Sequence, residues 1–256
     1  MTKPVYMKQH ILQDDIVLDG IRSINVLKDE RKINGRISGG MAVQSYLPRE
    51  LHRGTIDLDF SLLWNGCSTE YRKLCLPLID FLEKEGYLVS FRKKGLAYEI
   101  TYARENGKDS FIIQHPHKSN RHFEKTKHTL EREIANQHVS KINGLEFRTM
   151  SPEDLIVSKT NRALIFSERY GLKLPLNKSI TSLAIQAQKL KEDILPRGAE
   201  ACARDVALLR LVNDLYDLKC LSEHVEVDSN YLKQVLSEWG HRQTEIHDLL
   251  AEEINY

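Results

Sequence analysis

Two aspartates in an apolar run are the residues of this sequence best suited to chemistry. Asp57 and Asp59 lie within residues 55–63, most of which are apolar. Side chains on a β-strand alternate between its two faces, so both carboxylates point the same way. An apolar strand has no structural use for two such charges. Their oxygens instead suit Mg²⁺, which keeps waters in its shell and shares it with substrate phosphates.

A glycine turn stands sixteen residues before the acids, in the segment Ser38-Gly39-Gly40. Without a Cβ on either glycine, backbone N–H groups can come close to a triphosphate at the start of an expected helix over residues 41–46. The structural alternative is a common turn followed by a chance Asp-x-Asp. The two features together favour a site that handles nucleotides with a metal ion.

Lys159 is a basic candidate residue that its local sequence supports independently. Residues 151–154 read Ser-Pro-Glu-Asp, which gives a helix cap, a proline at the first helical position and acids in the first turn. Arg162 follows Lys159 by three residues, so the two cations share one helical face and could meet a triphosphate. The alternative is a solvated basic face.

Acids also occur on a later predicted helix. Asp214 and Asp217 are three residues apart amid leucines and a valine, so they need partners. Asp214 is the candidate for the site, and Asp205 is a rival. The structural alternative is that the two acids pair with nearby basic residues, namely Arg204, Arg210 or Lys219.

Three ordered segments carry a resemblance to a known family. They are Ser38-Gly39-Gly40-Met41-Ala42 with Thr55-Ile56-Asp57-Leu58-Asp59-Phe60, then the segment from Ser151 to Lys159, and then Asn213-Asp214-Leu215-Tyr216-Asp217-Leu218. This set resembles the AbiEii family of bacterial toxin nucleotidyltransferases, within the superfamily of DNA polymerase beta type. The resemblance implies an α+β fold, with a nucleotidyltransferase lobe of mixed sheet over residues 1–148 and a helical lobe over 149–256. The nucleotide is expected in a cleft between the lobes.

The resemblance also implies roles for single residues. Asp57 and Asp59 would bind the metal, and Ser38, Gly39 and Gly40 would touch nucleotide phosphates. Lys159, with Arg162 on the same face, would contact phosphate oxygens, and Asp214 would complete the site. Such parts fit nucleotidyl transfer, in which the protein mainly positions reactants and stabilises charge.

Two features depart from the family pattern. The strand expected over residues 110–115 ends in Gln114 and His115, where such enzymes often carry a third carboxylate. His115 and His117 could contact metal or substrate, although a His-x-His pair before a proline-containing or polar segment is more often a loop, and imidazole suits Zn²⁺ or Mn²⁺ better than Mg²⁺. The spacing from Lys159 to Asp214 is also long, and an extra helix would explain it.

Composition places the chain among ordinary globular proteins. It has 256 residues, 29% charged and 41% hydrophobic, with a net charge of +1. The balance argues against a nucleic-acid coat protein, although local basic surface could bind RNA. The four cysteines lack metal-type spacing and are expected to be reduced thiols. Without a long apolar run or a signal peptide, we expect a cytoplasmic protein with no membrane contact.

The elements that must position these residues follow from hydrophobic periodicity and turn signals. Strands are expected at 87–92, 96–103 and 110–114, with hairpin turns at 93–95 and 104–107. A basic and acidic stretch over 120–137 is expected to be a solvated helix face. The remaining expected helices cover residues 14–27, 67–85, 151–170, 177–195, 199–221 and 229–253.

The predicted activity is transfer of a nucleoside monophosphate from an NTP to an acceptor with Mg²⁺ or Mn²⁺. The resemblance implies tRNA as an acceptor, a role as a toxin and a cognate antitoxin protein as partner. Two alternatives stay open: a nucleotide-binding protein that acts on a partner without catalysis, and transfer to a hydroxyl of a protein or small molecule. The sequence fixes neither the acceptor nor the base.

Overall fold

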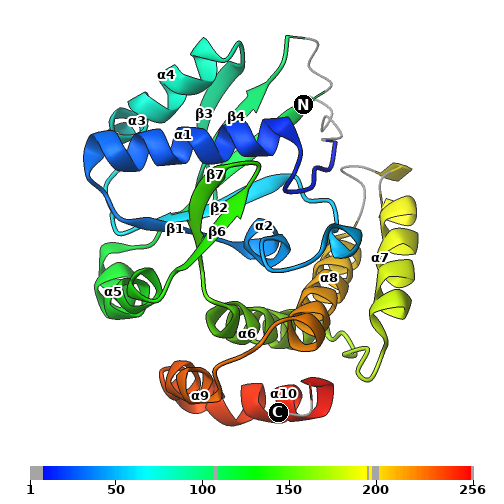
Figure 1. Cartoon of the computed structure of the whole chain (residues 1–256). Helices are drawn as coiled ribbons and strands as arrows, with labels where there is room; N and C mark the ends of the chain where they lie inside the picture. The colour runs from blue at the N-terminus through cyan, green and yellow to red at the C-terminus, as the bar shows by residue number, and fades with distance from the viewer. Residues whose placement is uncertain (1–7, 106–108, 195, 198–201, 255–256) are drawn as a thin grey trace. The chain divides into compact units, whose positions relative to one another are not determined.

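The computed structural model describes residues 8–105, 109–194, 196–197 and 202–254. The chain divides into two compact units, and the division falls between Ser151 and Pro152. The predicted boundary after residue 148 lies just before it. Strands of the described residues all belong to the first unit, and the second consists of helices (Figure 1). The predicted α+β class, a mixed sheet followed by a helical region, is therefore confirmed.

The first unit is built on a seven-stranded sheet with the order β3-β4-β5-β2-β1-β7-β6. It is mixed because β2 pairs parallel with β5 and β1 pairs parallel with β7, while the other neighbours are antiparallel. The strands are β1 (Gly35–Ser38), β2 (Asp57–Leu62), β3 (Leu88–Lys94), β4 (Ala97–Ala103), β5 (Ser110–Pro116), β6 (His138–Ile142) and β7 (Leu145–Thr149).

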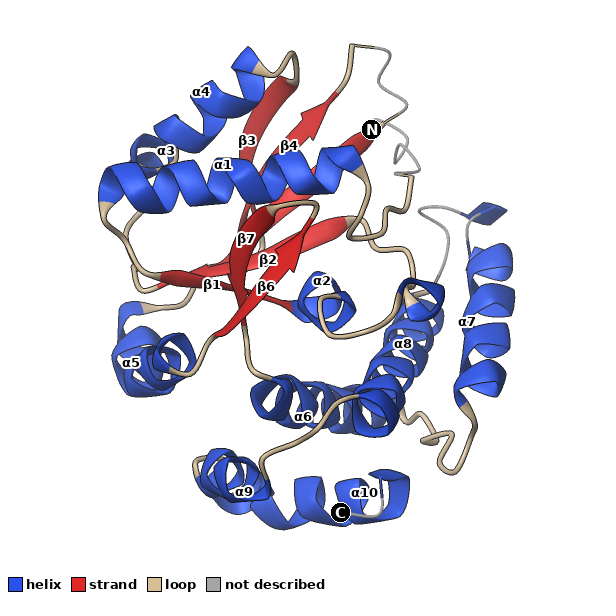
Figure 2. Ribbon diagram, in the orientation of Figure 1, coloured by secondary structure: helices blue, strands red, loops and turns tan. Residues whose placement is uncertain are grey.

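Helices cover the two faces of this sheet unequally. Figure 2 shows α1, α3 and α4 on one face and α5 on the other, with α2 at the end of β1. Under the first group lies the apolar core, where Leu58, Phe60 and Tyr102 are almost completely buried. The described part of this unit has five α-helices: α1 (Asp15–Arg31), α2 (Gly39–Gln44), α3 (Ser68–Leu74), α4 (Leu76–Lys84) and α5 (Asn120–Ala135).

The single helix expected over residues 67–85 is wrong, because the structure has two. Cys75 leaves helical geometry, with ψ at 4°, and Pro77 stands in the first turn of α4. Proline has no N–H to donate and its ring clashes with the preceding turn, so it tends to start a helix and to end the one before it. Hydrophobic periodicity alone predicts one continuous helix here, because it does not take Pro77 into account.

The helical unit begins with α6, whose first helical residue is Pro152, as predicted. Within the unit, α8 packs most extensively against α6 and α7. The expected helix 229–253 is interrupted, because Gly240 adopts a φ of +55° in a short 3₁₀ turn. The helices are α6 (Pro152–Tyr170), α7 (Ile180–Ile194), α8 (Ala203–His224), α9 (Ser229–Ser237) and α10 (Gln243–Ile254).

Three strands were missed by the sequence analysis: β1, β6 and β7. The last two form a hairpin whose turn, Asn143-Gly144, has positive φ at both residues. Asn-Gly is a strong signal for such a turn, and it stood in the sequence. By contrast, the predicted hairpin around Gly95 is confirmed by the antiparallel pairing of β3 with β4. The predicted turn at 104–107 extends into residues outside the described ones.

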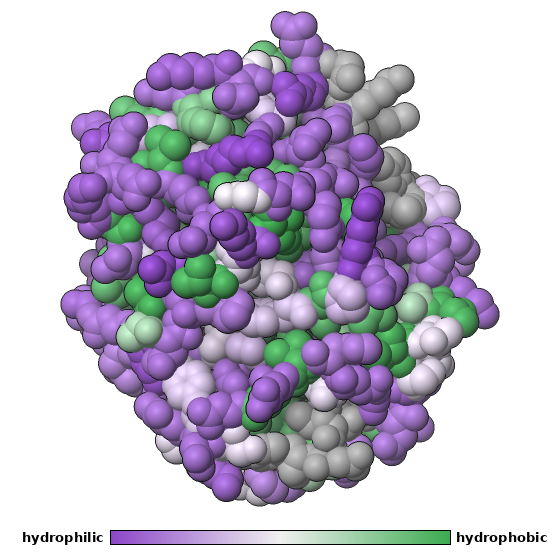
Figure 3. All heavy atoms as spheres, in the orientation of Figure 1, coloured by the Kyte–Doolittle hydropathy of each residue, from purple (hydrophilic) through white to green (hydrophobic). Residues whose placement is uncertain are grey.

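Hydrophilic residues cover most of the face in view in Figure 3, with small hydrophobic patches between them. Among the described residues, Leu96 in the β3–β4 turn is the most exposed large hydrophobic residue, at 80%. No helix within the described ranges combines the length and the apolar character needed to cross a bilayer.

Candidate functional site

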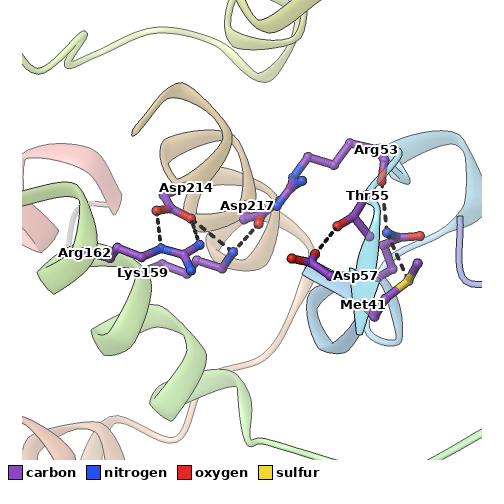
Figure 4. Close-up of polar contacts among 9 residues, drawn as sticks. Met41, Arg53, Thr55, Asp57, Lys159, Arg162, Asp214 and Asp217 are labelled. Atoms are coloured by element: carbon purple, nitrogen blue, oxygen red, sulfur yellow. Dashed lines mark hydrogen bonds and ion pairs between the residues drawn. The ribbon is translucent and has the colours of Figure 1, made fainter. Parts of the chain in front are cut away.

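The two acids lie on β2 as the alternation predicts. Asp57 and Asp59 are half-buried, while Leu58 and Phe60 between and after them are buried on the opposite face. Asp57 accepts a hydrogen bond of 2.8 Å from the hydroxyl of Thr55 (Figure 4). Both carboxylates therefore belong to the sheet face opposite the main apolar core, where oxygen ligands are accessible to solvent.

The glycine turn touches one of these acids directly. Ser38 is the register partner of Asp59, and Gly39 follows with a φ of +70°. A Cβ at Gly39 would lie 1.9 Å from Oδ2 of Asp59, which no side chain could tolerate. Glycine is thus required here twice, for its backbone conformation and for the close approach of a carboxylate. The predicted residues Ser38, Gly39 and Asp59 come together in one place.

An arginine that the sequence analysis missed lies over the other glycine. A Cβ at Gly40 would stand 3.0 Å from Nη2 of Arg53. The backbone of this arginine is held by Gln44, which donates to the Arg53 carbonyl at 3.0 Å and accepts from the N–H of Leu12 at 2.8 Å. The position of Arg53 just before Thr55 and the acid-bearing strand was the available signal. A guanidinium at this turn suits phosphate oxygens.

The neighbouring strand supplies no third carboxylate. Gln114 of β5 is the register partner of Asp59, so its half-buried side chain lies on the same face. Across the described residues, no three His, Cys, Asp or Glu side chains are grouped to hold a metal ion. Two carboxylates, with the amide oxygen of Gln114 on the adjacent strand, form the donor set that the residues offer. All are oxygen donors, which matches Mg²⁺ or Mn²⁺.

His115 belongs to the opposite side of the sheet from the acids. It lies within β5, so the loop interpretation is wrong for this residue, and its ring stacks on Tyr71 with centroids 5.0 Å apart. Burial lowers its pKa to about 4, so the imidazole is neutral. His117 packs against Tyr98 at 5.0 Å, and burial also lowers its pKa. The site role considered for His115 is thereby unsupported by its placement.

In the helical unit, Lys159 is buried and paired with two acids. Its Nζ lies 3.1 Å from Oδ1 of Asp214 and 2.5 Å from Oδ2 of Asp217, and the lysine is only 3% exposed. Arg162 also binds Asp214, with 2.6 Å from Nε to Oδ2 (Figure 4). The solvated basic face considered for Lys159 is therefore wrong, because this lysine of α6 pairs with both acids.

The charge of Asp214 is secured by these cations. Burial alone raises its pKa, but the charges of Arg162 and Lys159 and the hydrogen bond from Arg162 outweigh it, so the pKa lies below its usual value. Asp217 stands one turn later on α8, also buried. Asp205, the rival candidate, instead pairs with Arg197 at the surface, at 2.7 Å. The predicted residues Lys159, Arg162 and Asp214 form one ion-paired group.

The predicted site residues thus fall into two groups, each within its own unit. One is formed by Ser38, Gly39, Gly40, Asp57 and Asp59, and the other by Lys159, Arg162 and Asp214. The first presents carboxylates beside a glycine turn. The second is a buried network whose most accessible member is Arg162, with a side chain 45% exposed.

Comparison with known proteins gives structural likeness only. No family model matches the sequence, and no curated protein matches it. Similar solved structures include an antigenic nucleotidyltransferase-like protein from Paracoccidioides brasiliensis, with 14% identity, 93% of each chain covered and a TM-score of 0.44. At this identity and TM-score the likeness carries no conclusion about this chain, and the AbiEii family stays a prediction.

Two further structures are similar at a lower level. The antibiotic-resistance factor ANT(2'')-Ia has 16% identity over 90% of this chain and 95% of its own, with a TM-score of 0.37. The cyclic AMP-GMP synthase DncV from Vibrio cholerae has 11% identity over 89% of this chain and 68% of its own, with a TM-score of 0.29.

Proposed function

We propose that this protein is a nucleotidyltransferase that moves a nucleoside monophosphate from an NTP to a hydroxyl of an acceptor, with release of diphosphate. The observation that carries the proposal is the contact between Gly39 and the carboxylate of Asp59, with Asp57 on the same face. A side-chain-free turn against two accessible acids provides phosphate contacts and metal ligands in one place. A purely structural turn would not need an acid against it.

The residues of the sheet unit fit a divalent metal. Asp57 and Asp59 would hold Mg²⁺ or Mn²⁺, which would neutralise phosphate charge and favour the acceptor alkoxide. The backbone of Gly39 and Gly40 and the hydroxyl of Ser38 would receive phosphate oxygens. Arg53, which lies over Gly40, would neutralise the triphosphate from the same unit. Positioning and charge stabilisation are what this reaction asks of the protein.

The helical residues take roles that follow from their burial. Arg162 keeps a half-exposed side chain, so it is the member best placed to contact a phosphate. Lys159 is committed to Asp214 and Asp217 and would act mainly by holding this group rigid. Two roles stay predictions: Lys159 as a phosphate ligand and Asp214 as a catalytic acid. The ion pair between these residues favours a structural role for both instead.

The acceptor and the biological role belong to the same proposal. The resemblance to the AbiEii family supports tRNA as acceptor, a role as a toxin and a cognate antitoxin as partner. A neutralising protein encoded beside this one, and growth arrest on expression that the Asp57→Asn variant abolishes, are the expected results. Growth unaffected by expression of active enzyme would remove the toxin role and keep the transfer chemistry.

The decisive experiment uses each α-labelled NTP with Mg²⁺ or Mn²⁺ and either total cellular RNA or total protein. The wild type is compared with Asp57→Asn/Asp59→Asn and with Asp80→Asn, an exposed acid of the same unit that serves as the charge control. Label on one pool with the wild type and the control, but not with the double variant, is expected. Full labelling by the folded double variant would overturn the mechanism.

A second candidate function rests on Gln114. This amide stands beside Asp59 where a third carboxylate would bind a second metal ion, so the chain could bind NTP without turning it over. Metal-dependent NTP binding, with no label on RNA, protein or small molecules, would favour this binding protein. Transfer to a small-molecule hydroxyl would give label in the soluble fraction instead.

A further inference from the structure

A small charged cluster occupies the same sheet face as the acids. Arg36 lies on β1 two residues before Ser38, and its register partner is Ser61 of β2. Because side chains alternate along a strand, Arg36 shares the face of Ser38 and Asp59. Two residues along a strand correspond to about 7 Å. The arginine therefore stands one row away from the predicted phosphate and metal ligands, and no role has been assigned to it.

One side of the Arg36 guanidinium is hydrogen-bonded, and the other side has a nitrogen without a hydrogen-bond partner. Its Nε donates to Oε2 of Glu133 on α5 at 2.7 Å, and Nη2 contacts the same oxygen. Its Nη1 is buried and has no hydrogen-bond partner. Leaving a buried donor unpaired is unfavourable, and more so for a charged group. A guanidinium fixed by one carboxylate with a nitrogen to spare is a donor for a second anion.

Lys118 is the second cation of the cluster. Its Nζ donates to the hydroxyl of Thr126 at 2.9 Å. Burial lowers the pKa of Lys118, the Glu133 charge raises it, and the charge of Arg36 lowers it further. The pKa of Lys118 thus depends on the charges of both Arg36 and Glu133. Since it is only half-buried while Arg36 and Glu133 are buried, a ligand arriving from solvent would meet Lys118 first.

The charges of the cluster do not balance. Arg36 and Lys118 are two cations, and Glu133 is one carboxylate, which leaves one positive charge in a partly desolvated setting. Excess charge in such surroundings is unfavourable unless a counter-charge is present. Ion pairs at the surface of this protein do not carry this cost, because solvent screens their charges. The unpaired nitrogen of Arg36 and the second cation Lys118 together favour binding of an anion here.

We propose that Arg36 and Lys118 form a second anion subsite, which takes a phosphate group about one strand row from the acid pair. That the anion is a phosphate rests on the proposed nucleotidyl transfer. It comes either from the NTP or from a phosphodiester next to the acceptor hydroxyl. Glu133 orients Arg36 for this ligand and limits its affinity, because it competes for the same guanidinium.

The test is a calorimetric titration of the full chain with inorganic phosphate in the presence of EDTA, which removes any contribution from metal at the acids. Lys118→Gln is expected to weaken phosphate binding about tenfold, the loss of one charge-assisted hydrogen bond. Lys125→Gln, the same change at an exposed position of α5, is the matched control and should leave the affinity unchanged. Glu133→Gln should tighten binding, because it releases Arg36.

Equal phosphate affinity in the wild type and Lys118→Gln would overturn the subsite, since a structural cluster or a buried water predicts no change. Glu133→Gln also distinguishes a phosphate subsite from a structural cluster, because a structural role predicts lost stability without tighter phosphate binding. Titrations with an NTP and with a dinucleoside monophosphate then show which phosphate the subsite takes. The readout is binding without metal, so the subsite can fail while transfer activity stands, and transfer can fail while phosphate still binds.

Discussion

The two acidic groups of this chain are built in opposite ways. Asp57 and Asp59 are half-buried on a strand beside a glycine turn, and a hydroxyl is the partner of Asp57. Asp214 and Asp217 are 1% exposed on a helix, with a lysine between them. Half-buried acids beside a turn that has no side chains are suited to bind a ligand. Buried acids with a cation already beside them are suited to hold a structure.

The largest expected effect separates the groups by activity. Asp57→Asn/Asp59→Asn should lower nucleotidyl transfer by about 10³-fold or more, because charge stabilisation at the transition state is lost. The free energy of unfolding should change by less than about 1 kcal/mol, as for most substitutions away from the core. Transfer rates and urea unfolding measure both. A large loss of stability would instead show that Asp57 and Asp59 mainly stabilise the fold.

The second prediction concerns the buried acid. Asp214→Ala should lower the free energy of unfolding by about 3–5 kcal/mol, because Asp217 alone then faces the two cations Lys159 and Arg162, and one positive charge is left in excess. Urea unfolding of this variant beside Asp205→Ala, whose acid pairs at the surface, gives the contrast. Nearly equal losses for the two variants would show that burial does not distinguish them.

Acid should weaken the two units in different pH ranges. His115 has a folded pKa of about 4, below its unfolded value near 6.5, so the unfolded state binds the proton first. Its stability contribution is complete above pH 6.5 and is lost as the pH falls towards 4, by about 3 kcal/mol. Unfolding followed between pH 7 and 4 should show this loss, and His115→Gln should reduce it.

Asp214 should act at lower pH. Its folded pKa is below the unfolded value, so it stabilises the fold above the unfolded pKa, and this contribution is lost as the pH falls through the folded pKa. Hydrogen exchange read separately for α8 and for β5 would show which unit weakens first. Loss of protection in α8 before β5 as the pH falls from 7 would contradict this order.

The smallest effect compares the two glycines of the turn. Gly39→Ala should destabilise the sheet unit by about 1–3 kcal/mol and reduce NTP affinity, because φ is positive and Asp59 blocks the Cβ. Gly40→Ala meets only the flexible end of Arg53 and should cost less. Thermal unfolding and NTP titration of both variants make the measurement. The reverse ranking would contradict the close approach at Gly39.

Local signals explain what the sequence predicted well. Alternation placed Asp57 and Asp59 on one face, and Ser-Pro-Glu-Asp placed the start of α6 at Pro152. The Gly95 turn likewise predicted the β3–β4 hairpin. Each of these rests on residues within a few positions of one another, which is the range over which backbone preferences act.

Long-range pairing explains what it missed. Lys159 was considered as a solvated residue because its partners, Asp214 and Asp217, lie more than fifty residues later. The same holds for Glu133, part of an expected solvated face, which is buried against Arg36. Burial of a charge depends on tertiary packing, and no local pattern encodes it. The role of Gln114 beside Asp59 also needed the parallel register of β2 and β5.

The four-residue network of α6 and α8 restricts how this region can evolve. Lys159, Arg162, Asp214 and Asp217 sum to zero charge, so a change at one of them leaves an imbalance in the interior. A neutral replacement becomes tolerable only after a compensating change on the facing helix. Relatives of this protein should therefore differ here by paired exchanges, and single ones should appear only where added stability elsewhere offsets them.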